Sequence, residues 1–375
     1  MNLSMIKKNL NSWMMIVSLI VICIVFGILT KGIFLSPRNL SMLTRQTTVV
    51  GILSIGMMFV IVATHIDLSV GAIVGLTGTV AAVLQVWFHV GTIPTILIVV
   101  FLGILCGLAQ GYWVAYRGVP AFIITLGGLL IFKGIKLGIS KGASIAPMQD
   151  SYKAISQSYL NPTFSLLLGL VAVIAMIIMA LRRRQSKIKY GFPVDDMKLE
   201  IGKLGIYSML IIGAVLALNL YKGLPTALII LIIFVLIFSF IGNNTVFGRN
   251  IYSIGGNEEA SKLSGIKTER VVLMVFAINA ALASAAGIVL TARLNSATAA
   301  SGDGLELDAI AACVIGGTSM SGGKGKIIGV VIGALIMASL DNGMSLINLE
   351  NFWQYIVKGM VLVLAVWIDT ASKKK

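Results

Sequence analysis

Long apolar runs follow one another along almost the whole chain, and they restrict the fold more than any other feature of the sequence. Of the 375 residues, 58% are hydrophobic and 11% are charged, with a mean hydropathy of +0.98. An average soluble domain carries about 25% charged residues, and a helix needs about 20 apolar residues to cross a bilayer. The sequence therefore predicts an all-α, polytopic integral membrane protein with about 10–12 transmembrane helices.

The apolar runs give the approximate positions of these helices. Lys7 and Lys8 precede the first run as they would in a signal peptide, but TKGIFLSPRN behind it offers no small-x-small cleavage site, so we expect an uncleaved first span. The runs 205–220 and 308–320 are short, so ten or eleven spans are also compatible with the pattern. We place spans near 13–33, 47–64, 69–88, 93–115, 120–139, 164–181, 205–220, 224–242, 271–291, 308–320, 327–345 and 352–369.

Lysines and arginines set the expected orientation, because loops on the cytoplasmic side of a membrane protein are enriched in both. With both termini in the cytoplasm, the inner loops hold most of the 29 Lys and Arg residues, including Lys7, Lys8, the run 182–184, and Lys374 and Lys375. Three further lysines fall within predicted spans: Lys133, Lys136 and Lys358. This distribution explains the net charge of +15 without nucleic acid, so we expect no nucleic-acid partner.

Side chains that could carry catalysis or bind metal are few. Cys23, Cys106 and Cys313 lie in apolar runs, where cysteine acts as a small hydrophobic residue. A membrane enzyme needs a clustered catalytic set, which is hard to assemble with two histidines. We therefore expect a protein that is not an enzyme, with no metal and no cofactor.

The glycine-rich run GGTSMSGGKGK, residues 316–326, invites comparison with the phosphate-binding loop G-x-x-x-x-G-K-[ST]. Thr318 stands where that motif has its first glycine, and Gly325 follows Lys324 where the motif has Ser or Thr. We interpret the run as a turn between two spans, and we expect any ATP to be bound by a partner.

The longest patterned polar run is GRNIYSIGGNEEASKLSGIKTER, residues 248–270. Asn257 is a good helix N-cap, acidic residues at 258 and 259 suit the first turn, and Gly265 is a natural C′ residue. A helix this short must dock onto something, and Ala260 and Leu263 give it a small apolar face. The simpler interpretation, an amphipathic loop helix on the membrane surface, stays open on pattern alone.

Two other loops bear on the domain organisation. The run 182–204 is rich in both acidic and basic residues and is broken by Gly191 and Pro193, so we expect a flexible cytoplasmic linker. It divides the chain into two halves that need not be separate domains, and we treat residues 1–375 as one transmembrane domain. The outer loop 140–163 is compatible with a helical cap.

Glycines recur at intervals of four residues in three places, at 103/107/111, 134/138/142 and 325/329/333. Such stripes let helix backbones approach each other closely in lipid, where hydrophobic attraction does not drive helices together. We expect all three stripes to be packing surfaces.

Polar residues in apolar surroundings are the candidates for a translocation path. Asp67 and Asp308 each lie at a junction of apolar runs, and an ionisable group at membrane depth normally faces the protein interior or a water-filled path. Each could instead be a helix N-cap at a membrane surface, and the likeness of their surroundings could be the trace of an internal repeat with broken helices. The candidate path residues are Gln46, Asp67, Ser69, Asn279, Asp308 and Asn342.

Three stretches carry a resemblance to a known family: GGNEEASKLSGI in the polar run, HIDLSVGAIVGLTG at 65–78, and the segment 306–347. They resemble the permease subunits of bacterial ABC importers for ribose, xylose and galactose, in the same order along nearly the whole chain. The runs RGVPAFIITLGG, DNGMSLINLENFWQYIVKG and LAVWID resemble most the permeases for D-xylose.

The resemblance implies an importer in the inner membrane of a bacterium, with two copies of the permease around a translocation path, surrounded by lipid. It also implies an ATPase subunit with two nucleotide-binding domains and an extracytoplasmic sugar-binding protein. Ribose, galactose or another small sugar remains an alternative cargo, and a secondary transporter that uses Asp67 or Asp308 for ion coupling is a third possibility. The residues implied to couple to the ATPase are Gly255, Gly256, Asn257, Glu258, Glu259, Ala260, Leu263 and Gly265.

Overall fold

The computed structural model describes residues 10–194 and 196–373 and contains helices but no β-strand in that part of the chain. Lys7, Lys8, Lys374 and Lys375, which we used to predict the orientation, lie outside the described residues. The elements in chain order are α2 (Leu10–Leu29), η1 (Ile33–Leu35), α3 (Pro37–Val62), α4 (Val70–Ala82), η2 (Val83–Trp87), α5 (Thr92–Arg117), α6 (Ala121–Ser140), α7 (Asp150–Gln157), α8 (Pro162–Lys189), α9 (Met197–Asn219), α10 (Thr226–Asn244), α11 (Val246–Gly256), α12 (Glu258–Leu263), α13 (Thr268–Leu294), α14 (Leu305–Ile315), α15 (Ile327–Leu346) and α16 (Asn351–Lys373).

Ten helical segments in the described residues are long and apolar enough to cross a membrane, in agreement with the predicted all-α polytopic fold. They are α3, α4 continued by η2, α5, α6, α8, α9, α10, α13, α15 and α16. The span predicted at 308–320 is wrong. Helix α14 has 11 residues, so it is about 16 Å long and too short for the roughly 30 Å of a bilayer core.

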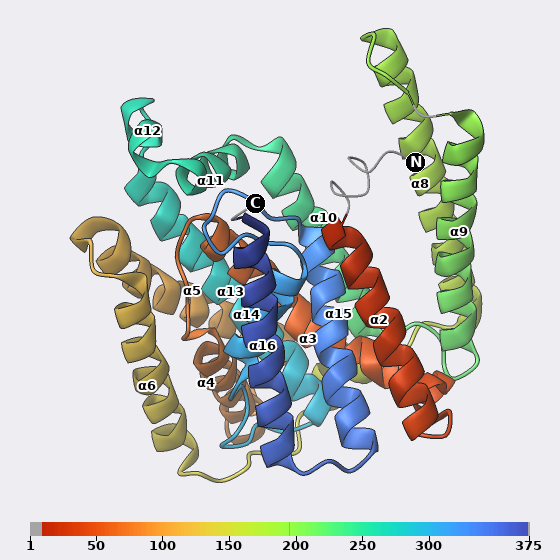
Figure 1. Ribbon diagram of the computed structural model, residues 1–375. Coiled ribbons are helices and arrows are strands. Elements are labelled where there is room, and N and C mark those ends of the chain that lie inside the picture. Colours follow the sequence, from red (N-terminus) through yellow and green to blue (C-terminus); the bar gives the residue numbers. More distant parts are fainter. Residues whose placement is uncertain (1–9, 195, 374–375) are drawn as a thin grey trace.

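Helices α3 and α13 form the centre of the bundle (Figure 1), and α4, α5, α14 and α15 pack around them. Their facing surfaces form one large core of aliphatic side chains, Met and Phe, which includes Ile52, Leu53, Met57 and Phe276. The start of α2 and the end of α16 lie at the same end of the bundle as α11 and α12 (Figure 1). The fold therefore exposes α11 and α12 at one end of the bundle, on a tightly packed base.

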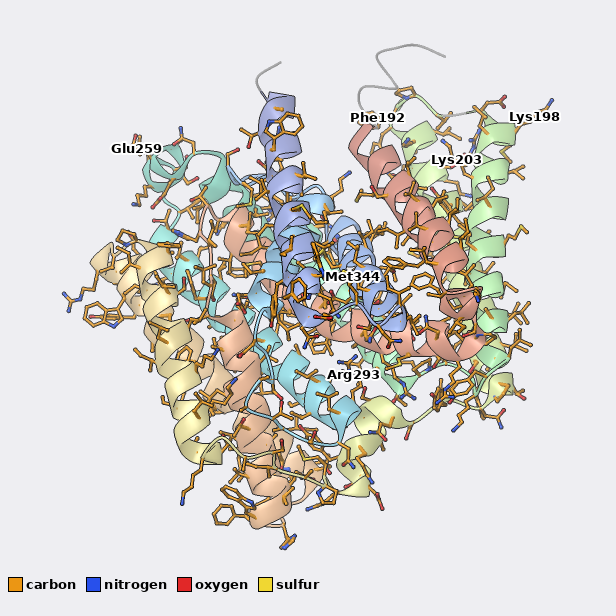
Figure 2. The ribbon with its side chains drawn as sticks, turned by 60° about the horizontal axis from the view of Figure 1, so that its bottom comes forward. Phe192, Lys198, Lys203, Glu259, Arg293 and Met344 are labelled. Carbon is orange, nitrogen blue, oxygen red and sulfur yellow. The ribbon has the colours of Figure 1, made fainter. Side chains whose placement is uncertain are left out.

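Helices α8 and α9 form a hairpin at one side of the bundle (Figure 1), whose tip carries Phe192 and Lys198 (Figure 2). The flexible linker that we predicted at 182–204 is mostly helical, because α8 runs to Lys189 and α9 begins at Met197. Arg184 and Glu200 form an ion pair between the two helices. Lys, Arg and Glu are good helix formers, so both helices continue beyond their apolar parts.

Two of the three predicted glycine stripes are packing surfaces. The stripe 103/107/111 on α5 lies against α13, and in the stripe 325/329/333 the residues at 329 and 333 lie against the end of α14. The stripe 134/138/142 meets no neighbour among the described residues of this chain, so its role as a packing surface stays a prediction. Glycines at every fourth residue leave one face of a helix without side chains, but they do not determine whether a second helix packs against that face.

The outer loop contains the helix that its sequence allowed. Tyr152 of α7 is fully buried, and its hydroxyl lies 2.9 Å from the Thr291 hydroxyl on α13. Helix α7 therefore lies against the end of α13 that is far from α11 and α12.

Candidate functional site

Helix α12 begins as its sequence predicts. Asn257 has an extended backbone, and its Oδ1 accepts a hydrogen bond of 2.9 Å from the backbone N–H of Ala260. Glu258 and Glu259 occupy the first turn, where the helix dipole favours negative charge. The predicted N-cap is confirmed.

The end of α12 is equally well defined. Gly265 has a φ of +82°, its N–H donates to the Lys262 carbonyl at 2.9 Å, and the Ile266 N–H donates to the Ser261 carbonyl at 3.1 Å. These two bonds form a Schellman motif, in which the C′ residue adopts the left-handed conformation that glycine allows. Gly265 is therefore the helix stop that we predicted.

The outer face of α12 is uncovered in this chain. Leu263 is 91% exposed, Glu259 and Ala260 are also exposed, and Figure 2 shows Glu259 at the edge of the molecule. Ser261, on the other side of the helix, is buried. The small apolar face that we predicted from Ala260 and Leu263 thus points away from the chain.

The base beneath α12 is made by close backbone contacts. Gly255, near the end of α11, lies so close to the Val62 carbonyl at the end of α3 and to Gly323 in the loop 316–326 that a Cβ would overlap them. The Gly323 N–H donates to the Val62 carbonyl at 3.0 Å, and the Tyr252 hydroxyl donates to the Gly325 carbonyl at 2.9 Å. The glycine-rich turn is therefore part of this base. Gly256, by contrast, has open space around it.

A cavity of about 280 Å³ lies beside α12, between the end of α5 and the start of α13, and Glu258, Lys262, Glu269 and His65 are among its lining residues. Glu258 Oε1 lies 2.8 Å from Lys262 Nζ, and this hydrogen bond and charge raise the pKa of Lys262. Burial lowers the pKa of His65, an effect that the charge of Glu258 opposes. This flank of α12 therefore presents paired charges beside a hollow.

Asp67 lies in the break between α3 and α4 and joins several helices. Its Oδ1 accepts hydrogen bonds from the backbone N–H and the hydroxyl of Ser69, at 2.8 and 2.6 Å, and its Oδ2 accepts one of 2.9 Å from Asn279 on α13. Gln110 of α5 donates to the Ser69 hydroxyl at 2.9 Å. All four residues are buried. The N-cap of α4 is Ser69, so the prediction that Asp67 is the N-cap is wrong.

Asp308 is not an N-cap either. It lies within the first turn of α14, whose N-cap is Gly304, and its Oδ2 accepts a hydrogen bond of 2.9 Å from Lys358 of α16. Lys358 also forms an ion pair of 2.8 Å with Asp341 of α15. The three charged residues therefore hold α14, α15 and α16 together.

The six residues proposed for the translocation path lie in four separate places. Asp67, Ser69 and Asn279 are together, and Asp308 is in the ion cluster. Asn342 exchanges two hydrogen bonds with Asn39 of α3, at 2.7 and 3.1 Å, which is a contact between helices. Gln46 is partly buried on α3. Their assignment to a path stays a prediction.

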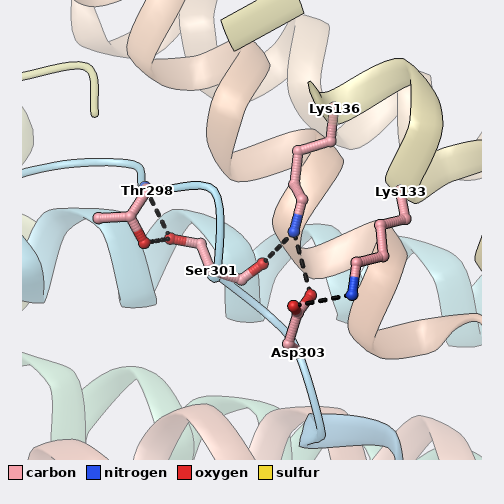
Figure 3. Close-up of polar contacts among 5 residues, drawn as sticks. All are labelled: Lys133, Lys136, Thr298, Ser301 and Asp303. Atoms are coloured by element: carbon pink, nitrogen blue, oxygen red, sulfur yellow. Dashed lines mark hydrogen bonds and ion pairs between the residues drawn. The ribbon is translucent and has the colours of Figure 1, made fainter. Parts of the chain in front are cut away.

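Our prediction from the sequence missed a second charged cluster, which links α6 to the loop before α14 (Figure 3). Lys136 is fully buried, and its Nζ lies 3.0 Å from the Ser301 carbonyl and 3.1 Å from Asp303 Oδ1. Lys133 Nζ lies 2.9 Å from Asp303 Oδ2. Gln110, Asp341 and Lys358 were also not selected. The sequence did contain a signal for both charged clusters, because a lysine inside an apolar run needs a partner. Lys133, Lys136 and Lys358 all lie in such runs.

Comparison with known proteins gives one family and several full-length relatives. Residues 39–366 match the family described as branched-chain amino acid transport system / permease component. The chain is 45% identical over 367 residues to the xylose transport system permease protein of Haemophilus influenzae, covering 98% of each chain. It is 45% identical to the xylose transport system permease protein of Escherichia coli K12, covering 98% of this chain and 93% of the relative. The ribose import permease protein of the same strain is 34% identical over 96% of both chains. No solved structure matches.

Proposed function

The chain belongs to the family of branched-chain amino acid transport system permease components, and on that premise we propose that it is the membrane-spanning subunit of an ATP-driven importer of D-xylose. It is a multi-pass protein of a bacterial inner membrane and a transport subunit. The xylose permeases are the more similar relatives, at 45% identity against 34% for the ribose permease, and this difference supports D-xylose over ribose as the cargo.

The observation that carries the proposal is the uncovered outer face of α12 on its closely packed base. A short helix with both ends capped and Leu263 91% exposed is suited to contact another protein. We assign this contact to an ATPase subunit, which would bind and hydrolyse the ATP. Extracytoplasmic delivery by a sugar-binding protein, pairing of two permease copies and contact with lipid are further parts of the proposal.

The base suggests how movement of α12 would reach the membrane helices. Gly255 contacts the end of α3 backbone to backbone. Asp67, in the break that follows α3, accepts a hydrogen bond from Asn279 of α13. A backbone contact has no flexible side chain to absorb a displacement, since packed interiors transmit strain. A push on α12 by the ATPase would therefore be passed to α3 and α13, the two central helices.

Two substitutions on the outer face test the coupling role. Glu259→Arg and Ala260→Trp change exposed side chains, so the permease should still insert into the membrane, whereas uptake of D-xylose by cells that make the whole importer should fall. A tagged chain extracted in mild detergent should bring down an ATPase with two nucleotide-binding domains, and the Ala260→Trp variant should not. Lys198→Glu at the exposed tip of the α8–α9 hairpin is the matched control and should behave as the parent.

Normal ATP-dependent uptake by both α12 variants would contradict the coupling role. If ribose or galactose competes with labelled D-xylose better than D-xylose itself does, the cargo assignment is wrong while the importer stands. An uncoupler that spares ATP should leave uptake intact, and prompt arrest of uptake would favour a secondary transporter.

A further inference from the structure

The bundle contains a cavity far from α12 whose lining is partly polar. It lies between α14, α15 and α16 and has a volume of about 240 Å³. A single water needs only about 10–15 Å³ of such space, so a small polar solute fits as well as a few waters. Its lining includes Asp303, Asp308, Lys358, Asn351, Gln354 and Tyr355.

One oxygen atom of the lining has no hydrogen-bond partner among the described residues. Asp308 is 2% exposed, its Oδ2 binds Lys358, and its Oδ1 has no hydrogen-bond partner among the described residues. A buried carboxylate oxygen without a partner loses the hydrogen bonds that it had in water, at a cost of about 1–3 kcal/mol or more. Because Asp308 lines the cavity, a donor inside the cavity would satisfy this atom.

The charges around the cavity favour a neutral molecule over an ion. Asp303 is paired with Lys133 and Lys136, and Asp308 is paired with Lys358, at distances of 2.9–3.1 Å. Cations and anions in the cavity would each face groups of their own sign. A polyhydroxy compound can donate to a carboxylate and also accept from a lysine, which has three N–H donors.

The apolar part of the lining suits the same class of ligand. Leu307, Met337 and Leu362 line the cavity together with Tyr355. Binding sites for small molecules combine such apolar walls with a few placed polar groups. A pentose offers hydroxyls on its edge and C–H groups on its faces, so it matches both.

The cavity reaches the end of the bundle at which a solute would enter from outside. Asn351 is the first residue of α16, and this end of α16 lies at the opposite end of the bundle from α11 and α12 (Figure 1). In the predicted orientation, this is the extracytoplasmic end. Asp303, held by Lys133 and Lys136 of α6 (Figure 3), also lines the cavity, so the α6 cluster fixes one side of it.

We propose that this cavity is a binding site for the pentose on its way into the permease, with Asp308 and Lys358 as the groups that bind its hydroxyls. The proposal rests on the proposed function as a sugar permease and adds the residues that touch the cargo. It also gives the Asp308–Lys358–Asp341 cluster a role beyond joining helices.

Protection of an introduced cysteine tests the site in membranes that contain the whole importer. The three native cysteines, Cys23, Cys106 and Cys313, are first replaced by Ala, and the probe Asn351→Cys is labelled from outside with an impermeant maleimide. Saturating D-xylose should slow labelling several-fold. The control Ser144→Cys lies in an exposed loop at the same end of the bundle and should label at the same rate with or without the sugar. Adding Asp308→Asn to the probe chain should abolish the protection in protein that still elutes as a monodisperse peak in detergent, which shows that the fold is intact.

Equal labelling of Asn351→Cys with and without D-xylose, in membranes that still take up the sugar, would overturn the site and leave the importer intact. Equal slowing by mannitol would overturn it as well. Slowing by ribose but not by D-xylose would support the site and correct the cargo. If the parent chain neither supports D-xylose uptake nor brings down an ATPase from mild detergent, the proposed function itself is refuted. In a chain with its native cysteines, Gln354→Ala should raise the half-saturating D-xylose concentration several-fold with little change in maximal uptake, whereas a purely structural residue would lower the maximum.

Discussion

Helix α12 and the cavity beside α14 both concentrate charged residues, but the surroundings of those charges differ. In the Glu258–Lys262 pair the side chains are 44% and 50% exposed, whereas in the Asp308–Lys358 pair they are 3% and 22% exposed. An exposed ion pair contributes about 0–1 kcal/mol, while removal of one partner of a buried pair costs about 3–5 kcal/mol. The same interaction is therefore nearly neutral for the fold in one region and essential in the other.

This difference separates a surface that can exchange partners from a site that must stay assembled. Water can replace the partner of any charge on α12, so another protein can displace these pairs without unfolding the helix. Asp308, whose side chain is 3% exposed, cannot lose Lys358 without leaving a buried charge unpaired. We therefore expect changes on α12 to act on association, and removal of a single charge from the Asp308–Lys358–Asp341 cluster to act on the fold.

The largest expected effect is that of Lys358→Met. It removes the cation that faces both Asp308 and Asp341, so the buried carboxylate of Asp308 and the partly buried one of Asp341 lose their partner. We expect a loss of about 3–5 kcal/mol of stability, seen as little monodisperse protein in detergent and a lower melting temperature. Lys358→Arg keeps the charge and should retain more folded protein.

A triple variant makes that comparison sharper. Lys358→Met combined with Asp308→Asn and Asp341→Asn removes all three charges, so it should recover much of the stability, because replacing a buried ion cluster as a whole is often nearly neutral. If the single and triple variants are equally unstable, the cluster stabilises the fold through shape and not through charge.

The next largest effect is expected at the base of α12, from Gly255→Ala. The new Cβ would overlap the Val62 carbonyl, and overpacking of this kind costs about 1–3 kcal/mol. We expect normal insertion with a clear fall in D-xylose uptake, because α11 must move away from α3. The matched control is Gly256→Ala, the next residue, which has open space and should transport normally. Equal uptake by the two variants would mean that the close contact at Gly255 has no part in coupling.

The ends of α12 were predictable because a cap depends on a few neighbouring residues. Asn257 and Gly265 each bond to groups within five positions along the chain, so the sequence alone contained the whole interaction. The partners of Asp67 and Asp308 were not predictable in this way. Asn279 lies 212 residues from Asp67, and Lys358 lies 50 residues from Asp308. One sequence shows that these groups are polar, but it does not show which of them face each other.

The errors in the fold have the same physical origin. Hydropathy counted 308–320 as a span, although Gly304 and Gly317, both with positive φ, bound the helix to 11 residues. Mixed charge suggested a linker at 182–204, although long charged side chains support a helix once the hairpin is formed. In both cases we predicted the structure from the average composition of a segment and gave too little weight to the local signals that begin, end or extend a helix.

A moderate effect is expected for Asn257→Ala, which removes the N-cap bond to Ala260. Loss of a cap costs about 1 kcal/mol, so α12 should fray without changing the stability of the bundle. Amide hydrogen exchange of residues 258–263 should be faster by several-fold while exchange in α3 and α13 is unchanged. Asn257→Asp keeps a capping oxygen and should restore slow exchange. Unchanged exchange in the alanine variant would show that the base, and not the cap, holds α12 helical.

The smallest effect on the fold is expected from the Glu258–Lys262 pair, and it tests the comparison most directly. The variants Glu258→Gln, Lys262→Gln and the double variant form a cycle in which the interaction energy should be about 0.2–0.5 kcal/mol or less in the isolated permease, because the pair is exposed. The same cycle measured on the affinity for the ATPase should give a larger value if the partner covers these charges, since a desolvated pair interacts more strongly. A large interaction energy in the isolated permease would contradict the distinction between the two regions. Values that are small in both measurements would move the contact with the ATPase to Glu259, Ala260 and Leu263, whose exposed side chains then carry the association without help from the ion pair.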